Sequence, residues 1–322
     1  MADLAQQQNS KKALLLKKPF VSALLAVVCC ALWGSAFPFI KLGYNEFNIP
    51  SQDWKTQILF AGIRFFIAGV LVILLGSVVS KRFLIPKKSS VKNTLTLSVF
   101  QTILQYVFFY IGLAHTTGTK GAVLNSTSVF FTVLVSALIF KQEKLNAKKI
   151  AGCVIGFAGT VLINFTQGGF DGNVSFSGEG FIIICSLSYA FSCVLIKIYG
   201  KKENPVILSG YQFMAGGFVM SVFALITGAR IENYTFKGLL ILFYLAVLSA
   251  VAYTLWGILL KYNHVSKIAV FGFMTPVFGC VFSALILREN VIDSLIKTVI
   301  SLLLVCAGII LVNYKKGDLN YD

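Results

Sequence analysis

Ten runs of mostly apolar residues follow one another along the chain, and short polar segments separate them. Each run contains roughly 20 residues, the length that an α-helix needs to cross a hydrocarbon core about 30 Å thick. The pattern therefore predicts an all-α integral membrane protein with ten transmembrane helices. The predicted spans are residues 20–43, 58–79, 95–114, 119–140, 147–165, 179–199, 205–228, 236–260, 267–287 and 294–314.

Two polar segments are longer than the others, and one of them divides the spans into two sets of five. Tyr44–Gln57 follows the first span, and Thr166–Gly178, which is rich in Gly, Asp and Asn, follows the fifth. The expected organisation is an N-terminal tail (1–19), a five-helix unit (20–165), a linker (166–178), a second five-helix unit (179–314) and a C-terminal tail (315–322).

The two sets of five spans resemble each other. The segment Lys120–Lys141 (KGAVLNSTSVFFTVLVSALIFK) aligns with Lys267–Arg288 (KIAVFGFMTPVFGCVFSALILR) at a shift of about 147 positions. Further equivalent positions are Trp33–Lys41 with Tyr189–Lys197, Arg64 and Phe65 with Gln212 and Phe213, Tyr106 with Tyr253, and Gly159–Asn164 with Gly308–Asn313. Because five spans is an odd number, the second unit enters the membrane upside down. This predicts an inverted repeat, an architecture of alternating-access transporters.

The basic residues predict how the chain is oriented. With the N-terminus in the cytoplasm, 19 of the 28 lysines and arginines fall on cytoplasmic segments, 6 on external segments and 3 near or within spans. Cytoplasmic loops of membrane proteins carry such an excess of positive charge. We therefore expect both termini in the cytoplasm and residues 166–178 outside.

Composition supports the membrane class and excludes others. The chain is 57% hydrophobic and 12% charged, whereas soluble domains carry about 25% charged residues. A net charge of +16 would suit a nucleic-acid partner, but the basic residues lie in short gaps where they set topology, so we expect none. The cysteines lie within apolar runs and the two histidines are far apart, so we predict no disulfide, no metal site and no cofactor.

The sequence resembles the EamA-type members of the drug/metabolite transporter superfamily over about residues 20–314. The resemblance is carried by the ten spans in two halves, by Ala31–Lys41 (ALWGSAFPFIK), by Ser266, Ala269 and Pro276 in span 9, by Glu143 and Glu289 after spans 4 and 9, and by the glycine-rich closing helix of each half. It implies export or exchange of small organic solutes through a central cavity lined chiefly by spans 1, 3, 4, 6, 8 and 9. Val129 stands where span 4 of this family often has a proline.

Two prolines lie inside spans, and each has a glycine four residues earlier: Gly34 before Pro38 and Gly272 before Pro276. An internal proline leaves the carbonyl four residues back without its hydrogen bond, and in a membrane that carbonyl must face protein or water. We interpret both units as helix bends beside the central cavity that take part in gating. A static kink that only serves packing is the alternative.

Aromatic side chains concentrate on the helices that the resemblance assigns to the cavity. The candidates for substrate contact are Trp33, Phe37, Tyr106, Tyr110, Tyr189, Tyr253 and Trp256. Tyr and Trp usually favour the membrane interfaces, yet several of these lie near the middle of a span, where a phenol requires a partner. A chamber of ring faces and hydroxyls would suit an amphiphilic organic solute, and ordinary helix packing is the alternative.

Polar residues in spans 4 and 9 are further candidates. Asn125 and Ser128 lie three positions apart on one helix face, and Thr275 is the repeat equivalent of Ser128. These side chains would contact substrate or, equally, hold helices together through hydrogen bonds.

Charged residues near the spans complete the set of candidates. Arg64 lies about six residues into span 2 and would anchor a substrate carboxylate, or else snorkel outward or pair structurally. Glu143 and Glu289 follow spans 4 and 9, and each needs a nearby cation, such as Lys148 or Lys149 for Glu143. We expect them to form ion pairs at the membrane edge, either as parts of a gate or as permanent surface pairs.

No Asp or Glu lies well inside a predicted span, so the usual carrier of a proton relay is absent. This absence favours facilitated diffusion, exchange, or coupling through a group at the membrane edge. The expected function is that of a multi-pass transporter, not an enzyme, in the plasma or inner membrane of a cell. Its partners would be the bilayer and a small organic metabolite such as an amino acid, with no obligatory protein partner. The alternatives are a carrier of a nucleotide-sugar or phosphorylated solute, which would need several cavity cations, and a membrane-embedded lipid-handling enzyme.

Overall fold

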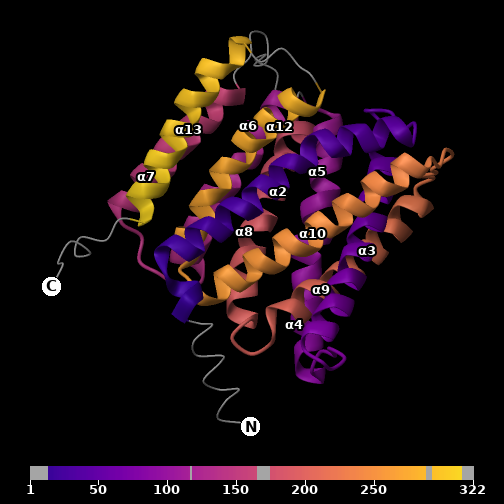
Figure 1. Cartoon of the computed structure of the whole chain (residues 1–322), viewed down its shortest axis with the longest axis horizontal. Coiled ribbons are helices and arrows are strands. Elements are labelled where there is room, and N and C mark those ends of the chain that lie inside the picture. The colour runs from indigo at the N-terminus through magenta and orange to yellow at the C-terminus, as the bar shows by residue number, and fades with distance from the viewer. Residues whose placement is uncertain (1–13, 117, 165–174, 288–291, 314–322) are drawn as a thin grey trace.

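The computed structural model describes residues 14–116, 118–164, 175–287 and 292–313, and within these ranges the secondary structure is helical without strands. Ten helical segments in these ranges are long and apolar enough to cross a membrane, which confirms the predicted all-α membrane fold. The elements, labelled as in Figure 1, are α2 (Pro19–Glu46), α3 (Trp54–Val79), α4 (Lys88–Ser98), η1 (Val99–Leu104), α5 (Gln105–Ala114), α6 (Gly118–Leu134), η2 (Val135–Ile139), α7 (Ala147–Asn164), η3 (Phe176–Gly180), α8 (Phe181–Tyr199), α9 (Pro205–Ile226), α10 (Phe236–Tyr262), α11 (Val265–Ala269), η4 (Val270–Phe273), α12 (Met274–Leu287) and α13 (Ile292–Asn313).

Two spans begin earlier than the apolar pattern predicts because polar residues form their first turns. The α3 helix begins at Trp54, and the side chain of Asp53 caps it by accepting a hydrogen bond from the Thr56 amide at 3.1 Å. The third span begins with the polar helix α4, in which the Thr94 hydroxyl donates to the Ser90 carbonyl. Most of the linker predicted at 166–178 lies outside the described residues.

Four short segments depart from α-helical geometry. Three are π-helical: η1 in the third span, η2 at the end of the fourth, and η3 at the start of the sixth. The fourth, η4, is a 3₁₀ turn in the ninth span, directly before the turn that contains Pro276. Such segments often mark functional sites or hinges in helices. By contrast, α2 continues as an α-helix through Pro38.

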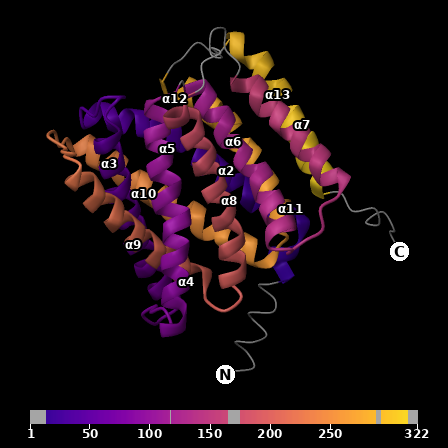
Figure 2. The ribbon, with the colours of Figure 1, turned by 180° about the vertical axis from the view of Figure 1, so that it is seen from behind.

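The helices form a bundle with two outer pairs and a central group. The α7 and α13 helices lie side by side along one edge, and α3 and α9 lie side by side along the opposite edge (Figures 1 and 2). Between these edges, α2 packs on α10 and α12, and α8 packs on α5 and α6. The first and sixth spans therefore occupy the middle of the bundle.

Glycines allow the backbones of α3 and α9 to approach closely at two points. A Cβ atom on Gly69 would lie 2.6 Å from the carbonyl oxygen of Gly210, and one on Gly217 would lie 2.6 Å from that of Gly62. Both distances are too short for a real side chain, so the contact requires glycine. Small residues at helix crossings permit this packing in membranes.

The α7 and α13 helices also meet through small residues. A Cβ atom on Gly308 would lie 2.5 Å from the carbonyl oxygen of Gly152, and one on Gly159 would lie 2.8 Å from that of Ser301. Each outer pair therefore joins one helix from residues 20–165 to one from residues 179–314 by close backbone contact.

Candidate functional site

A cluster of aromatic rings lies at the centre of the bundle. The Trp33 ring of α2 contacts the rings of Tyr253 and Trp256 of α10, each with centroids 5.0 Å apart in an edge-to-face arrangement. The hydroxyls of Tyr253 and Tyr106, which belongs to α5, share a hydrogen bond, and the Gln105 side chain donates to the Tyr253 hydroxyl at 3.4 Å. The structure therefore brings together four of the predicted aromatic candidates from three spans. We call the cluster, together with Arg64, Phe65 and Phe213, the central cluster.

Two phenylalanines of the central cluster are absent from the predicted candidates. Phe65 and Phe213 are fully buried and stack on each other with centroids 5.2 Å apart. Phe65 also packs on Tyr106 at 4.4 Å, and Phe213 packs on Tyr253 at 5.1 Å. The chain has 29 phenylalanines, so residue type alone did not distinguish these two. Phe65 and Phe213 occupy equivalent positions in the two halves of the chain, and this equivalence is the sequence signal that identifies them.

Arg64 lies inside the bundle and does not snorkel to the membrane surface. The residue is 4% exposed, and its guanidinium carbon lies 4.3 Å from the centroid of the Phe65 ring and 5.8 Å from that of Tyr106. The Nε and Nη1 atoms are buried without a hydrogen-bond partner among the described residues. No carboxylate among the described residues forms an ion pair with Arg64, so its positive charge has only aromatic rings as described partners.

Several other polar atoms around the central cluster are buried and unpaired within the described part of the chain. They are the Trp33 indole nitrogen, the Gln101 and Gln105 carbonyl oxygens, the Thr254 hydroxyl and the Gln212 amide nitrogen. Native proteins leave few buried polar groups unpaired, because each costs about 1–3 kcal/mol. Trp33 and Gln105 contact Tyr253 of the central cluster, so a polar molecule there would find one donor and one acceptor that lack partners among the described residues.

The remaining aromatic candidates lie in three different environments. Tyr110 is buried beside Tyr106, with ring centroids 6.2 Å apart. Tyr189 of α8 is partly buried and packs against two separate groups of buried apolar side chains. Phe37 is 43% exposed, and its ring lies against Gly279 of α12. Trp33 and Phe37 share a face of α2, but that helix meets α10 near Trp33 and α12 near Phe37. The described contacts therefore do not place Phe37 in the central cluster.

The polar candidates of spans 4 and 9 make contacts between helices. The side-chain oxygen of Asn125 accepts from the Cys185 thiol of α8 at 3.7 Å, and its backbone carbonyl accepts from the Ser186 hydroxyl at 3.3 Å. Thr275 of α12 contacts the Cys30 thiol of α2. Ser128 is partly exposed, and its carbonyl accepts from the Thr132 hydroxyl. The structure does not bring these residues into contact with the central cluster.

The two Gly-x-x-x-Pro units differ in their surroundings. A Cβ atom on Gly34 would lie 2.5 Å from the Phe278 side chain and 2.9 Å from the Gly279 amide, so α2 and α12 touch there. A Cβ atom on Gly272 would meet only one methyl group of Val129, at 3.1 Å. Gly272 belongs to the 3₁₀ turn η4, and Gly34 belongs to a regular helix. The departure from α-helical geometry occurs in span 9 and not in span 1.

Glu143, which follows span 4, joins the two sets of spans at one end of the bundle. Its carboxylate forms an ion pair with Lys149 at 2.6 Å and accepts hydrogen bonds from the Ser136 hydroxyl and from the amide and hydroxyl of Ser266. The carboxylate side chain is only 3% exposed. Burial alone would raise the pKa of Glu143, but the hydrogen bonds from Lys149 and Ser266 outweigh it and hold the pKa at about 2. Glu289 lies outside the described residues.

Glu179 forms a comparable network at the opposite end of the bundle. Its carboxylate accepts from the Thr116 hydroxyl at 2.6 Å and from the Ser175 amide at 2.8 Å, and it lies 3.5 Å from the Lys120 ammonium. Glu179 opens span 6, whereas Thr116 and Lys120 lie between and within spans 3 and 4. Both ends of the bundle therefore carry a buried carboxylate that links the first set of spans to the second.

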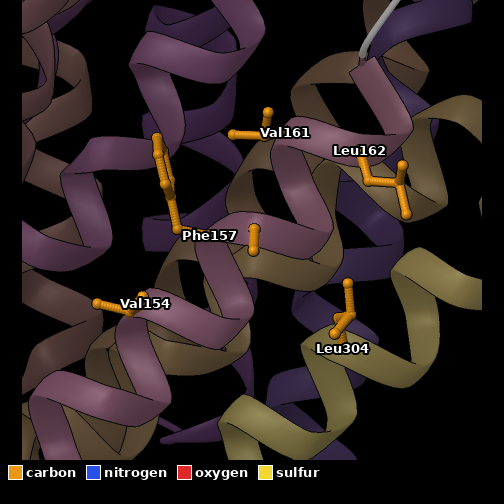
Figure 3. A pocket seen from close by; sticks show the side chains of 6 residues that line it. Val154, Phe157, Val161, Leu162 and Leu304 are labelled. Atoms are coloured by element: carbon orange, nitrogen blue, oxygen red, sulfur yellow. The ribbon is translucent and has the colours of Figure 1, made fainter.

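An apolar groove of about 590 Å³ runs along the edge formed by α7 and α13 (Figure 3). Its lining residues are Val154, Phe157, Ala158, Val161, Leu162 and Leu304. In a membrane, an open apolar groove between two spans faces lipid chains. It contains no side chain that could orient a polar solute, so it differs in kind from the central cluster.

Ten membrane-spanning helices around buried polar and aromatic side chains are the architecture of a multi-pass membrane transporter. The chain belongs to the EamA-like transporter family, whose model matches residues 20–165 and 176–314. This match confirms the resemblance on which the prediction of a transporter was based, and it indicates a transporter rather than an enzyme.

Related sequences support the family assignment, and a solved structure supports the fold. The chain is 28% identical over 272 residues to an uncharacterized transporter of Archaeoglobus fulgidus, covering 83% of this chain and 89% of the relative. It is 27% identical over 309 residues to the uncharacterized transporter YvbV of Bacillus subtilis, covering 91% and 92%. A protein crystal structure superposes with a TM-score of 0.72 at 16% identity, covering 90% of this chain and 97% of that chain, which supports the fold.

Proposed function

We propose that this protein is a secondary transporter that exports or exchanges a small organic metabolite, such as an amino acid, across a cell membrane. The two sets of five spans form an inverted repeat with both termini in the cytoplasm. Solute binds at the central cluster, and the two units move relative to each other so that the cluster opens to one side at a time.

The observation that carries this proposal is the hydrogen bond between Tyr106 and Tyr253. These residues are 147 positions apart, which is the shift that aligns the two halves. When a two-fold operation relates two units, a residue that touches its own equivalent lies close to the axis. The contact therefore supports an axis through the central cluster, where a transporter with inverted repeats has its solute site.

Reciprocal contacts between the outer helices support the same axis. At a shift of 148 positions, Gly62 corresponds to Gly210 and Gly69 to Gly217. The structure pairs Gly69 with Gly210 and Gly217 with Gly62, so each contact has its counterpart with the partners exchanged. A self-complementary contact of this kind is the property of a two-fold interface.

The networks at the two ends of the bundle are suited to gating. Glu143 and Ser266 join the two units at the end that the positive-inside rule places in the cytoplasm, and Glu179 and Lys120 join them at the other end. Both networks are formed at once in this structure, which fits a state in which neither end is open. Opening either end requires one network to break while the other holds.

The rival functions receive less support from the described residues. A phosphorylated solute needs several cations in its site, whereas the central cluster contains Arg64, and Lys197 donates instead to the Asn263 carbonyl. A lipid-handling enzyme would need a metal or a set of catalytic groups. The described residues contain no group of three or more His, Cys, Asp and Glu that could hold a metal.

Transport in liposomes tests the proposal. Purified protein should catalyse saturable counterflow of labelled amino acids, chosen to include neutral, acidic and aromatic ones, in both directions across the bilayer. Protein-free liposomes provide the control. Turnover of a lipid or its headgroup without any solute flux would favour the enzyme and contradict the transporter.

Cysteine labelling tests the inverted repeat separately. None of the seven native cysteines forms a disulfide and none is exposed, so they can be replaced to give an unreactive background. Lys144→Cys and Glu232→Cys then place exposed thiols in the segments after span 4 and before span 8. An impermeant reagent added outside should label only Glu232→Cys. Equal labelling of both positions contradicts the topology.

A further inference from the structure

Arg64 is the feature of the interior that packing and folding leave unexplained. It is 96% buried in the first half of α3, and no Asp or Glu among the described residues forms an ion pair with it. A charged side chain deep in a membrane protein costs at least about 2.5–3.5 kcal/mol. Such a residue normally faces a partner or a solute pathway.

The rings beside Arg64 occupy the faces of the guanidinium group. Phe65 lies 4.3 Å and Tyr106 lies 5.8 Å from its central carbon. Rings attract a cation but accept no ordinary hydrogen bond, so the N–H groups of Nε and Nη1 remain without acceptors. These donors lie within the same interior as the Tyr106–Tyr253 pair.

Three tyrosines lie near enough to Arg64 to interact with its charge. The charge of Arg64 interacts with the phenols of Tyr44, Tyr106 and Tyr253. The Tyr44 hydroxyl is buried and lies against the Tyr110 side chain. A phenol can donate a hydrogen bond to an anion, so an anion placed beside Arg64 would receive donors from at least two kinds of side chain.

The other half of the chain indicates that the fold does not need a cation at this position. The repeat equivalent of Arg64 is Gln212, which is fully buried at the corresponding place in α9. Its side-chain oxygen accepts a hydrogen bond from the Thr102 hydroxyl at 2.6 Å. A neutral amide therefore fills this position in the second half, although its nitrogen lacks a partner among the described residues, and only the first half has a charge there.

We propose that Arg64 binds the carboxylate group of the transported solute, while the rings of Trp33, Phe65 and Tyr106 contact its apolar part. This inference rests on the proposed transport function and adds the chemical class of the substrate, an organic carboxylate with an apolar body. A carboxylate needs one guanidinium group, whereas a phosphate calls for several cations. The single buried charge therefore selects the carboxylate.

Binding of four ligands tests the proposal. Three of them, 3-phenylpropionate, 3-phenylpropionamide and 3-phenylpropylamine, differ only in their polar group, and the fourth is phenyl phosphate. Trp33 and Trp256 lie in the central cluster, so tryptophan fluorescence of the purified full-length protein reports occupancy. We expect 3-phenylpropionate to bind at least tenfold more tightly than the other three, because a charge-assisted hydrogen bond is about twice as strong as a neutral one.

Three variants identify the group responsible for the preference. Arg64→Gln reproduces the residue of the other half and should abolish the preference by weakening the binding of 3-phenylpropionate at least tenfold. Arg64→Lys keeps the charge and should retain part of the preference. Lys55→Gln removes an exposed positive charge from the same helix and should bind as wild type does. Monodisperse elution and an unchanged unfolding temperature with the amide bound establish that each variant is folded.

The outcomes separate this inference from the proposed function. If wild type transports labelled amino acids but binds the amide or amine as tightly as the carboxylate, the role of Arg64 is refuted and the transporter stands. Equal binding of phenyl phosphate, or an undiminished carboxylate preference in Arg64→Gln, also refutes it. If the preference depends on Arg64 but no solute moves across liposomes, the site is retained and the transport function fails.

Discussion

Tyr106 of α5 and Tyr253 of α10 donate and accept one hydrogen bond between their hydroxyl groups, in the middle of the bundle. Neither ring is free to turn away, because Phe65 packs on Tyr106 and Phe213 packs on Tyr253. These two phenylalanines also stack on each other. Four rings from four different spans therefore form one contact network in which each half of the chain supplies the same two residues.

Removing either hydroxyl should weaken the contact between the halves. Tyr106→Phe and Tyr253→Phe keep the rings and remove only the hydrogen bond. Hydrogen bonds between membrane helices contribute about 0.6 kcal/mol on average and at most about 1.7. We expect each single variant to lose stability in this range, and the double variant to lose no more than one single variant. Unfolding in mixed micelles, followed by tryptophan fluorescence, measures all four proteins of the cycle.

Tyr262→Phe provides the control, because this residue lies at the end of α10, away from the central cluster. Any loss of stability caused by Tyr262→Phe should simply add to the loss caused by Tyr106→Phe or Tyr253→Phe. If the losses of Tyr106→Phe and Tyr253→Phe simply add, the two hydroxyls do not interact in the folded protein.

Hydrophobic pattern and length are sufficient to predict the ten helices, because each span must be long and apolar to cross the bilayer. The α3 helix begins four residues before the span that the apolar pattern predicts, for a local reason. Thr56 and Gln57 are polar, but both are hydrogen-bonded in this turn. The Asp53 side chain accepts from the Thr56 amide, and the Gln57 side-chain amide donates to the carbonyls of Pro50 and Ser51. Such hydrogen bonds allow polar residues to form the first turn of a helix. The apolar pattern of the sequence does not reveal these bonds, so it misses that turn.

The candidate site was only partly predictable. Trp33, Tyr106 and Tyr253 were identified because Tyr and Trp are conspicuous in the middle of a span, and the structure brings them together. Phe37 was paired with Trp33 from helical periodicity, but periodicity gives only the face of one helix. Which neighbour covers that face depends on where two helices cross, and α2 meets α12 at Phe37.

The close approach of α3 and α9 should be sensitive to a single methyl group. Gly69→Ala would place its Cβ atom 2.6 Å from both the Gly210 carbonyl oxygen and the Met214 amide nitrogen. Backbone atoms cannot rotate aside, so the helices must separate, at a cost of about 1–3 kcal/mol. Gly76→Ala, one heptad further along α3, meets only the ends of the Val206 and Leu84 side chains. It should lose clearly less stability in the same unfolding assay, and equal losses contradict close backbone contact at Gly69.

The Glu143 network should make stability depend on acid pH. The pKa of Glu143 is about 2 in the folded protein and 4.5 for an ordinary glutamate. A lowered pKa stabilises the fold above pH 4.5, and this contribution is lost as the pH falls from 4.5 to about 2. Glu143→Gln removes the charge that Lys149 and the Ser266 hydroxyl contact. We expect the variant to be less stable at pH 7, by about 1–3 kcal/mol, and the difference from wild type to shrink below pH 4.5.

Neighbouring charges define the control for this pH dependence. The charge of Glu143 also acts on His264, whose pKa is lowered by burial. Because protonation of His264 disfavours the fold below its ordinary pKa of 6.5, His264→Gln should remove any loss of stability that begins near that pH. It should leave the transition below pH 4.5 in place. A wild-type curve that is flat from pH 4.5 to 2 contradicts the assigned role of Glu143.

Pro276 should matter more for transport than Pro38, because the backbone departs from α-helical geometry at only one of them. The 3₁₀ turn η4 ends at Phe273, three residues before Pro276, and Gly272 within it touches only Val129. Pro276→Ala restores an N–H donor and removes the ring that crowds the Gly272 carbonyl, so α11 and α12 can join into one straight helix. Pro38→Ala makes the same chemical change in α2, which is already α-helical throughout. We expect Pro276→Ala to lower the counterflow rate at least fivefold and Pro38→Ala by less than twofold, measured in liposomes with matched protein content. Wild-type rates in both variants exclude bending at Pro276 as a step of transport, and equal loss in both places the bend in span 1 as well.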